Sequence, residues 1–175
     1  MDAGIAGIVG AAVGVVGTTL AAAVAGMSAQ RHVRAEHRHW RRQLRRDAYS
    51  AFTAKADEVS RLLKETHTEL IKSTVDFDLV RDRVAQARAA LRSELADAQA
   101  TVEIEGPEKL ARMAGELSRS LAACATTVHV ITLGQGPGAH AAVPEAEARR
   151  VNRFLNHAVA KRRQFVEHAR NTIDV

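Results

Sequence analysis

Residues 110–133, LARMAGELSRSLAACATTVHVITL, place apolar side chains at alternating intervals of three and four positions. The apolar positions are Leu110, Met113, Leu117, Leu121, Cys124, Val128 and Ile131. This is the spacing of a helix that packs side by side with other helices. Because one face of such a helix must be buried against partners, the stretch predicts a helical bundle.

Three further segments repeat this spacing. They extend to about residue 72, from about residue 76 to residue 101, and from residue 151 to residue 169. Aromatic residues make up only 3% of the chain, which suits a narrow bundle of close-packed helices better than a sheet. The apolar positions are Trp40, Leu44, Ala48, Phe52, Ala56, Val59, Leu63, Thr66 and Leu70; Phe77, Val80, Val84, Ala87, Leu91, Leu95 and Ala98; and Val151, Phe154, Leu155, Ala158, Phe165, Val166 and Ala169.

The helix boundaries are marked with unequal strength. Gly106-Pro107 predicts a helix start with Pro107 at the first helical position, and residues 134–144 are rich in glycine and proline and predict a loop. Residues 73–76 are marked only by the capping-type residues Ser73, Thr74 and Asp76 and contain no Gly or Pro, so they mark a weaker boundary. We expect a hairpin there, because one unbroken helix to Thr101 would leave its apolar face uncovered. The fold class predicted is all-α, with an antiparallel up-down bundle of about four long helices after an N-terminal transmembrane helix.

The segment Ala3–Ala29 contains no charged residue. As a helix it is roughly 40 Å long, enough to cross a ~30 Å hydrocarbon core. A cleaved signal peptide is the competing interpretation, but no positive residue precedes the segment and arginines follow it. The positive-inside rule then predicts a single-pass protein of the cell membrane with its N-terminus outside. We expect an anchor at 1–30, a basic juxtamembrane stalk helix at 31–46, and a cytoplasmic bundle at 47–175.

Small residues recur every four positions within this segment. The ridge consists of Ala6, Gly10, Gly14, Thr18, Ala22 and Gly26, with Gly7 and Gly17 beside it. Small residues at this spacing allow two membrane helices to approach closely, so the five glycines predict packing between anchors in a homo-oligomer. The alternative, that small residues are simply common in this composition, stays open.

A cationic stripe follows the anchor. Its arginines are Arg31, Arg34, Arg38, Arg41, Arg42 and Arg45. Anionic lipid head groups attract such a segment, so we predict lipid contact, although the charges also serve to fix topology alone. Nucleic-acid binding is less favoured, because no recognition module is present and only Trp40 lies among these arginines as a stacking residue.

No motif predicts a catalytic residue, a cofactor site or a metal site. Residues 134–139 match G-x-G-x-x-A, but the preceding run stays in helical phase and no second strand is evident, so we interpret the motif as a loop. Cys124 lies on the apolar seam, where a free cysteine is a small core residue. His32, Glu36 and His39 share a helix face but lie among arginines. The acidic residues near one hairpin end predict surface ion pairs instead of a cation site; they are Glu65, Glu69, Asp76, Asp78 and Asp82.

Three further stretches carry a resemblance. They are Arg45-Arg46-Asp47-Ala48-Tyr49-Ser50-Ala51-Phe52, Gly106-Pro107-Glu108-Lys109-Leu110, and a terminal helix with Phe165. Together with the Gly/Ala-rich first segment, they resemble a broad group of small actinobacterial membrane-anchored helical proteins of unknown function. The resemblance implies a fold and a location and no activity. We therefore expect a membrane-tethered interaction or scaffolding protein with an unidentified protein partner; a nucleic-acid-associated membrane protein that uses the arginine stripe is the alternative.

Changing Gly10, Gly14 and Gly26 to leucine tests the glycine ridge. We expect the wild-type protein to give discrete crosslinked oligomers in membranes, and the variant to lose them because its helix backbones are held apart. Crosslinking of both full-length proteins in membranes measures this. Equal oligomers from the two proteins would contradict the predicted packing.

Overall fold

The computed structural model describes Glu36 and residues 39–173 of the 175-residue chain. The chain divides into two compact units, Met1–Gln43 and Leu44–Val175. In the first unit the described residues are helical. The predicted anchor at 1–30 lies outside the described residues, and so do its packing positions Gly7, Gly10, Gly14, Gly17 and Gly26 and the arginines Arg31, Arg34 and Arg38. Within the described part of the chain, none of the helices has the length and apolar character that crossing a bilayer requires.

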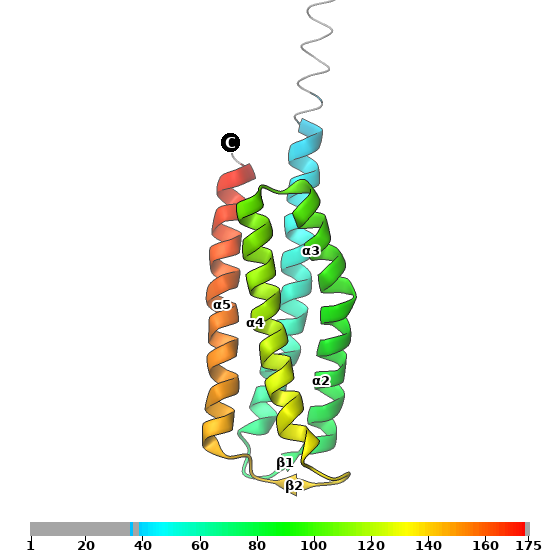
Figure 1. Cartoon of the computed structure of the whole chain (residues 1–175), viewed down its shortest axis with the longest axis vertical. Helices are drawn as coiled ribbons and strands as arrows, with labels where there is room; N and C mark the ends of the chain where they lie inside the picture. Colours follow the sequence, from blue (N-terminus) through cyan, green and yellow to red (C-terminus); the bar gives the residue numbers. More distant parts are fainter. Residues whose placement is uncertain (1–35, 37–38, 174–175) are drawn as a thin grey trace, which may run out of the picture. The chain divides into compact units, whose positions relative to one another are not determined.

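The second unit is a helical bundle, as predicted. A helix at residues 44–70 is followed by β1 (Val75–Asp76), α2 (Phe77–Arg92), α3 (Glu94–Glu105), α4 (Glu108–Leu133), β2 (His140–Ala141) and α5 (Glu145–Ile173). In Figure 1 the helices α2 and α3 follow one another in a single column, and α4 and α5 form columns beside it. Successive columns run in opposite directions, which gives an up-down arrangement. The two short strands pair with each other at one end of the bundle.

The expected hairpin at residues 73–76 is confirmed. Asp76 is the N-cap of α2, and its carboxylate accepts hydrogen bonds from the backbone N–H groups of Asp78 at 3.1 Å and Leu79 at 3.0 Å. These two groups would otherwise lack partners at the helix start. The weak boundary in the sequence is therefore a capped helix terminus.

The predicted second helix is interrupted at Ser93, which separates α2 from α3. Both the backbone N–H of Ser93 and its hydroxyl donate to the carbonyl oxygen of Ala89, at 3.1 and 2.9 Å. The same side-chain bond occurs at Thr66 and Ser120 within unbroken helices, so it does not cause the interruption. The interruption lies in the backbone of Ser93, whose φ of −106° and ψ of −87° depart from helical values. Beyond it, Leu95 and Val102 are buried, while Leu91 is only partly buried. The sequence pattern missed Val102.

At the other end of the bundle, Pro107 is the N-cap of α4 and not its first helical residue as expected. Gly106 before it is extended and lies against Tyr49. A Cβ atom on Gly106 would stand 2.7 Å from the carbonyl oxygen of Val102 and 3.1 Å from the Tyr49 hydroxyl. Only glycine fits this close approach between the α3–α4 connection and the 44–70 helix.

An aromatic cluster joins the 44–70 helix to α5. The ring of Phe165 lies 5.0 Å from that of Phe52 and 6.0 Å from that of Tyr49, the latter in an edge-to-face arrangement. All three side chains are buried. Trp40, which the pattern placed at the start of the core, is 57% exposed, so this expectation was wrong. The pattern also overlooked Ala114 and Ala125, both buried on α4.

Replacing Phe165 with alanine tests the aromatic cluster. We expect the free energy of unfolding to fall by about 3–5 kcal/mol, because the change removes a buried ring and leaves a cavity between two helices. Urea unfolding of the full-length protein followed by circular dichroism measures it. The exposed neighbour Gln164→Ala is the matched control, with an expected change within about 0.5 kcal/mol. A similar decrease in the free energy of unfolding in both variants would show that the aromatic cluster does not stabilise the core.

Candidate functional site

A recess of about 430 Å³ lies at the strand end of the bundle, between the end of α4, the start of α5 and the loop that joins them. Its volume falls within the range of small-molecule and side-chain binding pockets. The recess is lined by Phe77, Thr126, Thr127, Val130, Ile131, Gly134, Gln135, Ala142, Val143, Pro144, Glu147 and Arg150. We call this feature the α4–α5 recess.

The lining of the α4–α5 recess is mostly apolar. Phe77 is buried, Ile131 and Val143 are partly buried against the core, and Val130 is 60% exposed. Glu147 and Arg150 are the only ionisable side chains in the lining, and neither has an ion-pair partner among the described residues. The recess therefore offers an apolar surface beside one basic and one acidic side chain.

The loop over the recess is held by a strand pair. β1 and β2 are antiparallel, with Val75 opposite Ala141 and Asp76 opposite His140. Val75 is fully buried, so this short pair is continuous with the core. The sequence pattern does not predict these strands, because two residues are too few to show a period of two.

Two side chains of α2 hold the same loop from the other side. The guanidinium of Arg81 donates to the carbonyl oxygens of Gln135 at 2.9 Å and Gly136 at 3.3 Å. Asp78 pairs with Arg81 and accepts a 2.9 Å hydrogen bond from the backbone N–H of Gly138. We call this group the Asp78–Arg81 latch. Gly138 has a φ of +69°, a conformation that favours glycine.

The latch also sets the charge of Asp78. The hydrogen bond from Arg81 lowers the pKa of the Asp78 carboxyl most, and the Gly138 N–H adds to the effect. Both interactions stabilise the ionised form. The carboxylate is therefore retained to lower pH than that of an ordinary aspartate.

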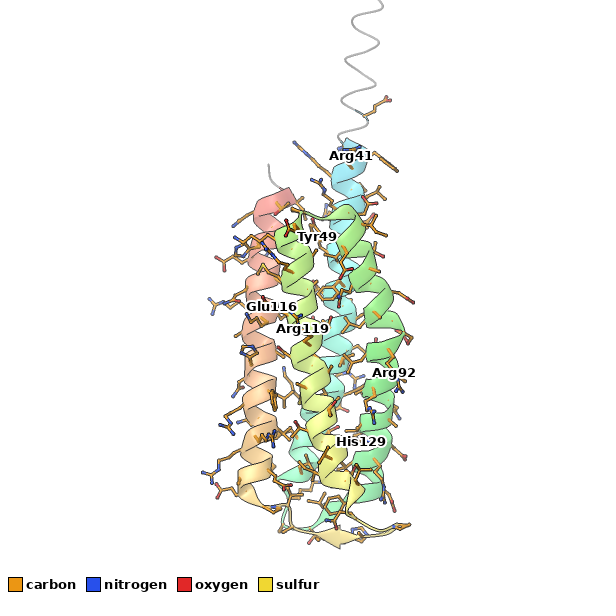
Figure 2. The ribbon with its side chains drawn as sticks, viewed as in Figure 1. Arg41, Tyr49, Arg92, Glu116, Arg119 and His129 are labelled. Atoms are coloured by element: carbon orange, nitrogen blue, oxygen red, sulfur yellow. The ribbon has the colours of Figure 1, made fainter. Side chains whose placement is uncertain are left out.

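The interpretation of residues 134–139 as a loop is confirmed. Residues 128–133 belong to α4, and the glycines that follow connect α4 to β2 without a phosphate-binding strand–turn–helix arrangement. His129 projects from α4 near the recess end of the bundle (Figure 2). The placement of Cys124 in the core is confirmed as well. Burial raises the pKa of its thiol to about 12, so the thiol is not a ready nucleophile at neutral pH.

Three of the five acidic residues near the hairpin form ion pairs, as expected, whereas Asp76 caps α2 and Asp82 forms no ion pair with any described residue. Glu65 pairs with Arg61 at 2.8 Å, Glu69 pairs with Lys72 at 2.7 Å, and Asp78 belongs to the latch. Within the part of the chain that the structure describes, no three acidic, histidine or cysteine side chains are placed to hold a metal ion.

Of the arginines predicted to contact lipid, Arg41, Arg42 and Arg45 are described. Arg41, labelled in Figure 2, and Arg42 are exposed. Arg45 is half-buried, and its Nε donates a 2.9 Å hydrogen bond to the carbonyl oxygen of Glu105. This carbonyl ends α3 and has no partner within its own helix. Arg45 thus has a capping role in the bundle that the sequence pattern did not suggest.

Comparison of the chain with protein-family models, with curated proteins and with solved structures gave no match. The class that the described residues define is therefore structural: an all-α bundle with a latched loop over an apolar recess. The resemblance to small membrane-anchored helical proteins stays a prediction.

Replacing Arg81 with glutamine tests the latch. We expect hydrogen exchange of the amides of residues 135–140 to become severalfold faster, because the loop loses its charged donor and the Asp78 ion pair. Arg88→Gln on the same helix is the control, and helical amides of α5 should keep their exchange rates in both variants. Unchanged loop exchange in Arg81→Gln would show that the strand pair alone holds the loop.

The latch should also respond to acid. Because the pKa of Asp78 is lowered in the folded chain, its contribution is complete above the ordinary aspartate pKa of about 3.9 and is lost as the pH falls through the lowered value. The Gly138 amide signal in NMR spectra should shift with a midpoint below that ordinary value. A midpoint at or above it would contradict the hydrogen bond.

Proposed function

We propose that this chain is a non-enzymatic, membrane-tethered interaction protein, whose bundle binds a partner protein through the α4–α5 recess. The observation that carries the proposal is the composition of the recess: an apolar surface of pocket size beside the guanidinium of Arg150, which forms no ion pair with any described residue. Such a site suits an apolar side chain next to a carboxylate on the partner. The proposal therefore commits to a protein segment of that chemistry.

The construction of the recess supports binding by a preformed site. Its loop is held by the β1–β2 pair and by the Asp78–Arg81 latch, so the recess does not have to be ordered when a partner arrives. Preorganisation lowers the entropic cost of association. Glu147, the other ionisable residue of the lining, lies about one helical turn before Arg150 and restricts which charge the partner can place there.

The tether rests on the sequence. The uncharged segment Ala3–Ala29 is long enough to cross a bilayer, and arginines follow it. This arrangement supports an anchor with the bundle on the cytoplasmic side. The five glycines of the anchor support self-association, which would present several recesses together and turn a binding protein into a scaffold.

The alternative is a nucleic-acid-associated membrane protein that uses the juxtamembrane arginines. Arg45 already donates its Nε to the carbonyl oxygen of Glu105, so a phosphate ligand would compete with an existing hydrogen bond. DNA or RNA binding that weakens steeply with salt, and that is lost when Arg41 and Arg42 become glutamine, would favour this alternative.

Photocrosslinking from the recess tests the proposed function. A photoreactive amino acid in place of Val143 in the full-length protein should capture a discrete partner in cells. Capture should be lost when Arg150 becomes glutamate, because the charge that faces the partner carboxylate is reversed. The same photoreactive residue at exposed Ala54, on the 44–70 helix, is the control.

The recess and the tether can be contradicted separately. Equal capture from positions 54 and 143, or capture that survives Arg150→Glu, would show that the recess is not the binding site. Release of the full-length protein from membranes by alkaline carbonate would remove the tether and leave the recess untouched.

A further inference from the structure

Charge is distributed very unevenly between two helices of the bundle. α5 carries Arg149, Arg150, Arg153, Lys161, Arg162, Arg163 and Arg170 against the three acids Glu145, Glu147 and Glu167. α3 carries Glu94, Asp97, Glu103 and Glu105 and has no lysine or arginine. One helix of the bundle is therefore strongly basic and another purely acidic.

The two helices lie on opposite sides of the bundle. α4 packs against both α3 and α5, and Figure 1 shows α5 and the α2–α3 column on either side of it. Behind α4, the 44–70 helix binds both columns: Lys55 pairs with Glu94 of α3, and Asp57 pairs with Arg162 of α5. The acidic and basic outer faces therefore point in different directions and cannot neutralise each other within one chain.

Part of each charged face is already used inside the chain. On α5, Lys161 pairs with Glu116 of α4 at 2.6 Å, and Arg162 pairs with Asp57. Glu116 is labelled on α4 in Figure 2. On α3, Glu94 pairs with Lys55, and Glu103 accepts a hydrogen bond from Gln99. The ion pairs of Lys161, Arg162 and Glu94 lie at the edges of the two faces, where the helices meet their neighbours. The bond between Gln99 and Glu103 lies within α3 and leaves Glu103 exposed.

The centre of each face is unpartnered. Arg153, Arg163 and Arg170 are exposed on α5 and form no ion pair with any described residue. Asp97 is likewise exposed on α3, without an ion pair in the described bundle. Positions 153, 163 and 170 of one helix fall within the same outer third of its circumference, and exposed Glu167 lies between Arg163 and Arg170 on that side. The three guanidinium groups therefore form a ridge that stays basic in net charge, although it includes one acid.

Each centre also exposes one branched aliphatic side chain. Ile104 of α3 is 79% exposed, and Val159 of α5 is 45% exposed. Ile104 lies beside Glu103 and one to two turns from Asp97, and Val159 lies between Arg153 and Arg163 along α5. Each charged face therefore exposes one apolar side chain, Ile104 among the acids of α3 and Val159 among the arginines of α5.

We propose that the acidic face of α3 in one copy docks on the basic ridge of α5 in a second copy of this chain, with Ile104 against Val159. The occupant is a second copy because the chain itself supplies both complementary surfaces on opposite sides. The inference rests on the proposed self-association and adds a second contact to it, outside the membrane anchor.

The contact is heterologous, because each copy uses two different surfaces. An open row of associated copies therefore has a free acidic face at one end and a free basic face at the other. Further copies can add to these faces unless the row closes into a ring. Exposed ion pairs contribute little individually and are screened by salt. Tethering to one membrane raises the local concentration, which allows a weak contact of this kind to hold.

Disulfide trapping in native membranes tests the contact. Full-length chains carrying Ile104→Cys and others carrying Val159→Cys, with different tags, are expressed together and oxidised with copper–phenanthroline. Two thiols lose their protons and two electrons to the oxidant, and one disulfide forms between the copies. Cys124 is buried and does not compete. A heterodimer is expected, and Ile71→Cys, also exposed, replaces Ile104→Cys in the control.

Charge exchange identifies the surfaces. Arg153→Glu with Arg163→Glu in the Val159→Cys copy should lower the trapped fraction at least about fivefold, because like charges then face each other. Asp97→Lys with Glu103→Lys in the other copy should restore it. Lys64→Glu, an exposed change of the same sign on the 44–70 helix, should have no effect, and circular dichroism checks that each variant folds.

Failure of the inference is distinguishable from failure of the tether. If the chains stay in carbonate-washed membranes and no Ile104–Val159 product forms, the inference is overturned while the tether stands. The inference is also overturned if charge reversal leaves the trapped fraction unchanged, or if Ile71→Cys gives as much trapped dimer as Ile104→Cys. If α5 reversal instead abolishes binding to DNA or to an acidic protein with no trapped dimer present, the basic ridge belongs to that partner and the inference fails.

Discussion

The packing of α4 is the constraint on which the rest of the structure depends. Its apolar face is buried by three helices of the bundle, and it is the element with the most regular spacing of three and four. Leu110, Leu117, Leu121 and Val128 all lie in the core. Because one long helix must be covered along its whole length, its partners are fixed in direction and register, and both the recess and the charged outer faces follow from that placement.

Periodicity predicted the helices because burial repeats with each turn. It failed where structure depends on one residue's backbone or on single contacts between distant residues. The break at Ser93 is a local departure of one residue from helical φ and ψ, and no Gly or Pro marks it in the sequence. Arg81 reaches Gln135 across 54 positions of sequence, a contact that no local pattern carries. Trp40 continues the apolar spacing of its helix but is exposed. The spacing shows which side of a helix is apolar and does not show at which residue its packing begins.

The candidate site was harder to predict than the fold for a physical reason. A recess is a shape that arises between elements, so its lining comes from α2, α4, α5 and a loop. The sequence did mark residues 134–144 as a loop, and the helical run that precedes its glycines is confirmed. It gave Arg45 a role at the membrane, whereas the structure adds a capping bond to α3. The sequence does not show whether an arginine is exposed to solvent or hydrogen-bonded inside the bundle, because the carbonyl that accepts the bond is distant in sequence.

The strand pair and the latch have a consequence for how the bundle assembles. Each helical hairpin forms mainly from contacts between neighbours in sequence, which is the fast route for helical proteins. The contacts of Asp78 with Gly138 and of Val75 with Ala141 join the two hairpins and require both to be in place. They therefore form after each hairpin has formed. The aromatic cluster at the opposite end joins the same two hairpins through Phe52, Tyr49 and Phe165, so the two ends together fix how one hairpin docks on the other.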